Sequence, residues 1–275
     1  MTVTSDAATA LEPLRIGDSV LHNRLIHGTG RFPSDAVLSA CLRAAGPSMV
    51  TLAIRRLALD SGHGADSVAQ ADHNELAGVD LSPYVLLPNT AGATTATQAV
   101  RLAHLARAAS LSPLIKVEVV GDERTLLPDP VGTLEATRIL AGEGFTVLAY
   151  TSDDVVLALR LEEAGAAAVM PGAAPIGTTL GIQNALNLRM IIDRVGVPVV
   201  VDAGLGVPSE AARCMEWGAS AVLVNTAIAR AQDPVAMALA FSEAVVAGRR
   251  AHLAGRAEIS LDAAASSPRA GVPSS

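Results

Sequence analysis

Lys116 is the residue of this sequence whose type and setting most directly suggest chemistry. It is the only lysine in 275 residues, against 19 arginines, and it lies within the apolar run 114–120. An ammonium group in such a run must be paired or neutralised, because burying an isolated charge is costly. Side chains alternate along a strand, so Lys116 and Glu118 point to the same face. An amine beside a carboxylate could attack a carbonyl group and move protons.

Two interpretations of Lys116 are open. It could be a half-buried residue whose tip reaches solvent, left over from a compositional bias against lysine. It could instead be a primary amine whose pKa is lowered by desolvation, so that it forms a Schiff base with a carbonyl substrate. We favour the second, because buried, partnered ionisable groups are more often functional than scattered ones. Arginine stays protonated and could not do this chemistry.

Other polar residues follow predicted strands. Asp202 closes the apolar run 199–201, so it could act as a general acid or base, although capping of a turn is the alternative. Asp153 is a weaker candidate, because the run 152–154 before a helical segment is typical of a helix cap. The wider set at strand ends is His27, Thr29, Arg55, Arg56, Asn89, Thr90 and Thr151.

Several backbone amides could bind a phosphate. Gly204 and Gly206 follow the seventh predicted strand, and Asn225 and Thr226 close the eighth. Loops at these places commonly bind phosphate in α/β barrels, helped by a helix N-terminus. Gly177, after the sixth strand, could add another amide. Together with an amine nucleophile, these loops indicate a phosphorylated carbonyl substrate.

The elements that must position these residues alternate along the chain. Eight apolar runs are predicted strands, at 24–28, 49–54, 84–89, 114–120, 145–151, 167–172, 198–204 and 221–227. Segments of helical period lie between them; 95–109 has an apolar stripe, and 233–248 starts with Asp233-Pro234 and ends at Gly248. Similar segments follow Ser34, Pro130, Ser152, Gln183 and Pro208.

This alternation predicts an α/β protein with a single-domain (β/α)8 TIM barrel, rather than a doubly wound open sheet. We expect the barrel to span residues 1–256. Residues 257–275 are rich in Ala, Ser and Pro, and we expect a tail there that is a flap or disordered. The stretch 57–82 is expected to be partly irregular.

Composition excludes several classes of protein. Half of the residues are hydrophobic but only 2% are aromatic, which suits an aliphatic parallel sheet. The net charge of −7 and the lack of a basic cluster argue against nucleic acid as a partner. Cys41 and Cys214 have no disulfide or zinc spacing. No metal or nucleotide motif, clean apolar span or secretion signal is apparent, so we expect no cofactor, no membrane and a cytoplasmic location.

Seven segments match a known family in the same order and in a single alignment, which runs from about residue 14 to residue 267. They are 27–32, 87–92, 115–119, 126–130, 174–177, 201–204 and 225–229, with the close of the tail at Ser266-Ser267-Pro268. Together they resemble the thiazole synthase family of bacterial thiamin biosynthesis. The resemblance implies a barrel enzyme, a transferase of sulfur-containing groups, whose lysine forms an imine with 1-deoxy-D-xylulose 5-phosphate.

The resemblance also implies partners and roles. Sulfur arrives as the C-terminal thiocarboxylate of a small ubiquitin-like sulfur-carrier protein, and dehydroglycine completes the thiazole phosphate. Lys116 matches the imine-forming lysine, and Glu118 and Asp202 match the carboxylates that transfer protons. The matching phosphosugar-binding positions are Gly177, Ala203, Gly204, Asn225 and Thr226. We also expect a homo-oligomer, with its subunit number open.

Departures from the family pattern leave alternatives open. The sequence reads Ala93, Thr94 and Thr95, then Thr97-Gln98, where the family has cysteine and later two glutamates, and the loop 171–179 is altered. One alternative is a 2-thiosugar phosphate synthase acting on a hexose phosphate, such as glucose 6-phosphate, in natural-product biosynthesis. A lesser one is a Schiff-base aldolase, and another is a non-catalytic phosphosugar-binding subunit. Thiazole formation is favoured as the commoner activity.

Overall fold

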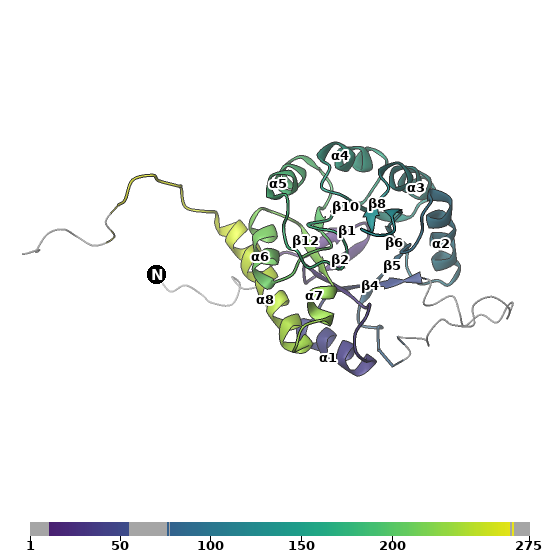
Figure 1. Cartoon of the computed structure of the whole chain (residues 1–275), viewed down its shortest axis with the longest axis horizontal. Coiled ribbons are helices and arrows are strands. Elements are labelled where there is room, and N and C mark those ends of the chain that lie inside the picture. Colours follow the sequence, from purple (N-terminus) through teal and green to yellow (C-terminus); the bar gives the residue numbers. More distant parts are fainter. Residues whose placement is uncertain (1–10, 55–75, 77, 265, 267–275) are drawn as a thin grey trace, which may run out of the picture.

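Eight parallel strands close into a barrel in the computed structural model, which describes residues 11–54, 76, 78–264 and 266 (Figure 1). The strands are β3 (Leu25–Gly28), β4 (Met49–Ala53), β5 (Val85–Asn89), β6 (Leu114–Val117), β9 (Thr146–Thr151), β10 (Ala168–Pro171), β11 (Val200–Val201) and β12 (Ala221–Val224). Each pairs with the next in chain order, and β12 pairs with β3. Parallel bridges at Val169–Val199 and Gly172–Asp202 join β10 to β11. The predicted TIM barrel is confirmed.

Helices surround the barrel (Figure 1). They are α1 (Asp35–Ala45), α2 (Ala96–Ala108), α3 (Pro130–Gly142), α4 (Val155–Glu163), α5 (Ala185–Arg194), α6 (Pro208–Glu216), α7 (Thr226–Ala229) and α8 (Pro234–Ala254). Side chains such as Ile115 and Val117 pack outward in the same apolar cluster as the small residues of α2. Most of the stretch 57–82, expected to be irregular, lies outside the described residues.

A hairpin that the sequence did not predict closes one end of the barrel. It consists of β1 (Leu14–Ile16) and β2 (Ser19–Leu21), which pair antiparallel. Ile16 and Leu21 are buried in one cluster with interior side chains of the barrel strands, among them Leu114 and Leu148. Packed apolar side chains therefore fill the interior of the barrel at this end, as is usual for the fold.

The fourth predicted strand was too long. β6 ends at Val117, and the chain then forms a second hairpin from β7 (Val120–Asp122) and β8 (Leu127–Pro128). The backbone N–H of Val120 donates to Ala93 O at 2.7 Å, and that of Asp129 donates to Val119 O at 2.8 Å. These bonds turn the chain out of the barrel and over the end where the other strands finish.

Gly248 does not end the last helix as predicted, because α8 continues to Ala254. A Cβ atom at Gly248 would overlap the backbone of Ala212 on α6, so the glycine allows the two helices to approach closely. The helix ends instead before Gly255, which has a φ of 77°.

The described part of the tail, residues 257–264 and 266, is exposed and has no helix or strand. It leads away from the barrel beyond α8 (Figure 1). Whether it is a flap stays a prediction, and the rest of the tail lies outside the described residues. Within the part of the chain that the structure describes, no helix combines the length and apolarity needed to cross a membrane.

Candidate active site

A cavity of about 360 Å³ opens where the barrel strands end, opposite the β1–β2 hairpin. The loops after six of the eight strands and residues of β4 itself contribute to its lining, and Lys116, Glu118 and Asp202 all belong to it. This is the end of a TIM barrel where active sites are found. Strand alternation places Lys116 inside the barrel, one layer above the apolar side chain of Leu114.

The structure brings the three predicted ionisable groups together. Lys116 Nζ lies 2.5 Å from Asp202 Oδ2 and 3.8 Å from Glu118 Oε2. Lys116, Glu118 and Asp202 are only 5%, 8% and 2% exposed. The amine is therefore held between two carboxylates with little access to water. This arrangement rules out the interpretation of Lys116 as a residue whose tip reaches bulk solvent.

Thr90 fixes the chain on which two of these groups sit. Its hydroxyl donates to Glu118 O at 2.8 Å and accepts from Glu118 N–H at 2.8 Å. Its backbone N–H donates to Lys116 O at 3.1 Å. Thr90 is fully buried, where backbone groups without partners would be costly. Its bonds replace the hydrogen bonds between strands that are lost where β6 ends. Thr90 was predicted to lie at a strand end near the site, but its bonds to Glu118 were not predicted.

The charges around Lys116 reverse one expectation. Burial lowers the pKa of Lys116, but the neighbouring charges of Asp202 and Glu118 raise it more, so it lies above the ordinary value of 10.5. The expectation that desolvation would leave a lowered pKa was wrong for the free enzyme. Burial also raises the pKa of Glu118 above its ordinary value, and the charge of Asp202 adds to this, against the opposing effect of Lys116.

Tyr150 is a fourth member of the cluster that sequence reasoning missed. Lys116 Nζ lies 5.0 Å from the centre of its ring, within range of a cation–π interaction. Tyr150 is 1% exposed, and burial together with the charges of Asp202 and Glu118 raises its pKa, so the phenol stays neutral. Strand alternation along β9 places Tyr150 inside the barrel with Leu148, and that signal could have identified it.

The predicted phosphosugar-binding residues all line the same cavity. They are Gly177, Ala203, Gly204, Asn225 and Thr226. The loops that carry them are packed together: a Cβ atom at Gly204 would overlap Ala174, and one at Gly177 would lie 3.9 Å from Thr226 Oγ1. Gly177 and Gly204 have φ values of 77° and 75°, which favour glycine.

Backbone strain is concentrated around this cavity. Five described residues other than glycine have positive φ, and four of them line the cavity: Arg31, Leu126, Thr179 and Ala203, with φ from 52° to 63°. Such conformations cost roughly 1–3 kcal/mol each and persist where the surroundings enforce them. Their clustering is typical of a functional site.

Other predicted candidates lie outside the cavity. Asp154 caps α4 by accepting from Val156 N–H at 2.8 Å, and its neighbour Asp153 is absent from the cavity lining, which supports the helix-cap interpretation. His27 is buried against Phe32, and burial lowers its pKa to about 4, so its ring is neutral. Arg55 and Arg56 fall outside the described residues.

The two cysteines, Cys41 and Cys214, are free and buried. Burial raises the pKa of Cys214 to about 12. Among residues 11–54, 76, 78–264 and 266, no group of three or more His, Cys, Asp or Glu side chains could hold a metal ion.

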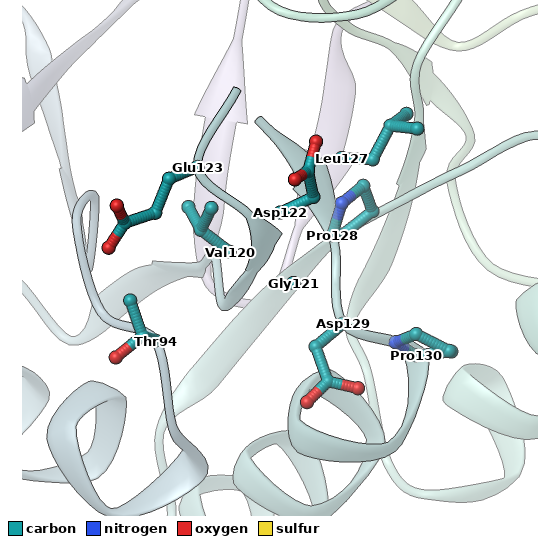
Figure 2. A pocket seen from close by; sticks show the side chains of 9 residues that line it. All are labelled: Thr94, Val120, Gly121, Asp122, Glu123, Leu127, Pro128, Asp129 and Pro130. Carbon is teal, nitrogen blue, oxygen red and sulfur yellow. The ribbon is translucent and has the colours of Figure 1, made fainter. Parts of the chain in front are cut away.

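The β7–β8 hairpin forms one wall of the cavity. Leu126 in its turn lines the cavity, and Val120 borders both the cavity and an open groove of about 500 Å³ on the other side (Figure 2). The groove is acidic, but Asp129 caps α3 through Val131 N–H at 2.9 Å and Asp122 accepts from Thr125 N–H at 2.9 Å. Two of its three carboxylates, Asp122 and Asp129, therefore have local structural roles.

The departures from the family pattern divide into two groups. Thr95 and Gln98 begin α2, where Thr95 Oγ1 accepts from Gln98 N–H at 3.2 Å and Gln98 Oε1 accepts from Thr94 N–H at 2.8 Å. This is a capping arrangement, outside the Lys116 cavity. Thr179, in the altered loop after β10, does line the cavity. Of the two groups, only the second includes a residue of the cavity lining.

Comparisons with known proteins agree with this geometry. The family model for "Thiazole biosynthesis protein ThiG" matches residues 15–268. The chain is 52% identical over 259 residues to a thiazole synthase of Geobacillus sp. (strain WCH70), covering 94% of this chain and 98% of the relative. It is 49% identical over 258 residues to the thiazole synthase of Staphylococcus saprophyticus, with coverage of 94% and 98%.

A solved structure is also similar. A chain from the Amycolatopsis orientalis BexX/CysO complex matches with a TM-score of 0.79 and 33% sequence identity. The match covers 91% of this chain and 100% of that chain.

Proposed function

This chain belongs to the thiazole synthase family of sulfur-transferring enzymes, and we propose that its Lys116 forms an imine with 1-deoxy-D-xylulose 5-phosphate on the way to thiazole phosphate. One observation carries most of the proposal. The only lysine of the chain is buried between Glu118 and Asp202, at the floor of a cavity whose rim is made of glycine-containing loops.

The raised pKa of Lys116 determines the first step. The resting amine is protonated, so it must pass a proton to a carboxylate before it attacks the substrate carbonyl. Asp202 Oδ2 is 2.5 Å away and is the natural acceptor. Attack then gives a carbinolamine at the carbonyl carbon.

Glu118 is suited to the second step. Burial raises its pKa above the ordinary value, so it holds a proton more readily than an exposed glutamate does and can donate that proton to the carbinolamine hydroxyl as water leaves. One of the two carboxylates then removes a proton from the carbon next to the imine, which gives an enaminol. Addition of a proton at the former imine carbon, with loss of the enol proton, leaves the ketone on the neighbouring carbon. Tyr150 stabilises the positively charged forms of the nitrogen, the resting ammonium and the iminium, because its ring lies near Lys116 Nζ.

The substrate phosphate binds at the other side of the cavity in this proposal. Backbone amides of the loops that carry Gly177, Ala203 and Gly204 supply hydrogen bonds, together with those at Asn225 and Thr226. The close packing of these loops fixes the distance between phosphate and amine, and that distance selects sugars of a given length.

The sulfur donor is the C-terminal thiocarboxylate of a small ubiquitin-like carrier protein. The similar BexX chain comes from a complex with CysO, which supports a protein partner for this chain as well. The thiocarboxylate sulfur adds to the new ketone, the carrier's acyl group passes from sulfur to the oxygen formed there, and the carrier then leaves as its carboxylate. Dehydroglycine completes the ring. A homo-oligomer and a cytoplasmic location remain predictions.

One observation supports a second candidate, a 2-thiosugar phosphate synthase acting on a hexose phosphate such as glucose 6-phosphate. Thr179 belongs to the altered loop and lines the cavity, where it could contact a longer sugar. The imine chemistry would be the same. We favour thiazole formation because relatives of about 50% identity carry the name thiazole synthase.

Borohydride trapping tests the proposal. The protein is incubated with a panel of pentulose and hexose phosphates, reduced, and measured by intact mass spectrometry. We expect one adduct with the mass of 1-deoxy-D-xylulose 5-phosphate and none with glucose 6-phosphate. An adduct with the hexose alone supports the second candidate, cleavage of a sugar without a carrier indicates an aldolase, and no adduct with any sugar contradicts imine chemistry.

A further inference from the structure

Arg31 differs from the other charged residues of the cavity. Among the described residues, four charged side chains line it, and Lys116 pairs with two of the others, Glu118 and Asp202. No carboxylate within the described parts of the chain pairs with Arg31, although its side chain is exposed at the cavity. Arg31 is thus the one cation among the described lining residues that no protein carboxylate neutralises.

The backbone of Arg31 is held in a costly conformation. Its φ of 63° lies in the left-handed region, which favours glycine, yet the residue is an arginine directly after Gly30. The preceding turn is fixed on both sides. Thr29 Oγ1 donates to Thr51 O at 2.9 Å, and a Cβ atom at Gly28 would overlap the side chain of Asn225. The loop therefore presents Arg31 from a rigid support.

The same packing places this loop beside the proposed phosphate-binding residues. Gly28 contacts Asn225, and Asn225 is followed by Thr226, whose hydroxyl lies next to the Gly177 loop. A sugar phosphate carries up to two negative charges, and it must enter a cavity that already contains two carboxylates and one lysine. Backbone amides offer only partial charges, so a full cation is needed to offset the repulsion.

We propose that Arg31 binds the phosphate group of the sugar substrate and completes the phosphate site of the cavity. The guanidinium fork suits two phosphate oxygens at once, which a lysine ammonium does not. This inference rests on the proposed function, because it needs a phosphorylated substrate at Lys116. It adds a side chain to a site that was otherwise made of backbone amides, Asn225 and Thr226.

The test measures the sugar phosphate concentration that gives half-maximal borohydride trapping. Arg31→Gln should raise this concentration roughly 10- to 100-fold, as expected for loss of a charge-assisted hydrogen bond, and Arg31→Lys should give an intermediate value. With the same sugar lacking its phosphate, wild type and Arg31→Gln should be equally weak. Arg101→Gln, on the exposed side of α2, is the matched control and should leave trapping unchanged.

A second variant separates binding from folding. Arg31→Gly removes the charge and suits the positive φ, so its melting temperature should equal or exceed that of wild type while phosphate affinity falls as in Arg31→Gln. Unchanged half-maximal trapping in both variants, or an equal loss with the unphosphorylated sugar, overturns the proposal. Calorimetry with inorganic phosphate tests Arg31 without the imine step, and equal phosphate binding by wild type and Arg31→Gln overturns the role of Arg31. The absence of any adduct with wild type is a different result, which contradicts the imine proposal.

Discussion

The two ends of the barrel use buried polar groups in opposite ways. At the closed end, Arg24 is buried and its guanidinium donates to Ser220 O at 2.8 Å and pairs with Glu12. At the open end, buried charges surround one amine, and Arg31 has no carboxylate partner within the described residues. One end is arranged for stability, while the other keeps strained loops and charges for chemistry. The following variants test this division.

Asp202→Asn should have the largest effect. Loss of the proton acceptor 2.5 Å from Lys116 Nζ should lower turnover on the order of 10²- to 10⁴-fold, as removal of a general base commonly does. The maximal rate, more than the concentration for half-maximal trapping, should change. Steady-state assays with the carrier protein measure this. A rate within threefold of wild type contradicts the assigned role of Asp202.

Ile16→Ala should show the opposite behaviour, because Ile16 belongs to the closed end and is 1% exposed. We expect a loss of roughly 2–5 kcal/mol in the free energy of unfolding, with unchanged turnover per folded molecule. Urea denaturation and activity at low temperature provide the two values. Ile259→Ala, at an exposed position of the tail, is the control and should change neither. A loss of activity without a loss of stability in Ile16→Ala would contradict the division between a closed end that stabilises the fold and an open end that carries the chemistry.

Glu118→Gln should change how stability depends on pH. The pKa of Glu118 is raised above 4.5 in the folded state, so that state keeps a proton that the unfolded chain releases above this pH. The free energy of unfolding therefore falls as pH rises from about 4.5 through the raised pKa. The variant cannot titrate and should lack this decrease. Parallel pH profiles of wild type and variant, measured by urea denaturation, would be inconsistent with the raised pKa.

Tyr150 should give the smallest effect. Tyr150→Leu removes the ring beside Lys116 Nζ and should slow trapping roughly 3- to 30-fold, the range of a partly desolvated cation–π interaction. Tyr150→Phe keeps the ring and should stay close to wild type. The ratio of the two trapping rates is the readout. Equal losses in both variants would assign the effect to the hydroxyl group and not to the ring.

The barrel strands were predictable because each is a short aliphatic run followed by a helical segment. The two extra hairpins were not, since β1 and β2 have three residues each and β8 has two, too few for a periodic signal. Gly248 shows another limit: the sequence marks a special backbone position but does not say whether a turn or a neighbouring helix requires it.

In the site, strand alternation was enough to pair Lys116 with Glu118. It could not supply the 2.5 Å contact with Asp202, which depends on closure of the barrel between elements far apart in the chain. The error in the pKa of Lys116 follows from this, because desolvation was considered without that contact. Tyr150 was missed because an aromatic residue in an apolar run is usually a core residue.

The central claim, that the buried amine of Lys116 captures the sugar carbonyl, is tested most directly by locating the adduct. After borohydride reduction with 1-deoxy-D-xylulose 5-phosphate, peptide mass spectrometry should find the reduced sugar on Lys116, and Lys116→Arg should carry none. Because the chain has a single lysine, the α-amino group is the main competing site. An adduct confined to the α-amino group, or one that persists in Lys116→Arg, contradicts the account.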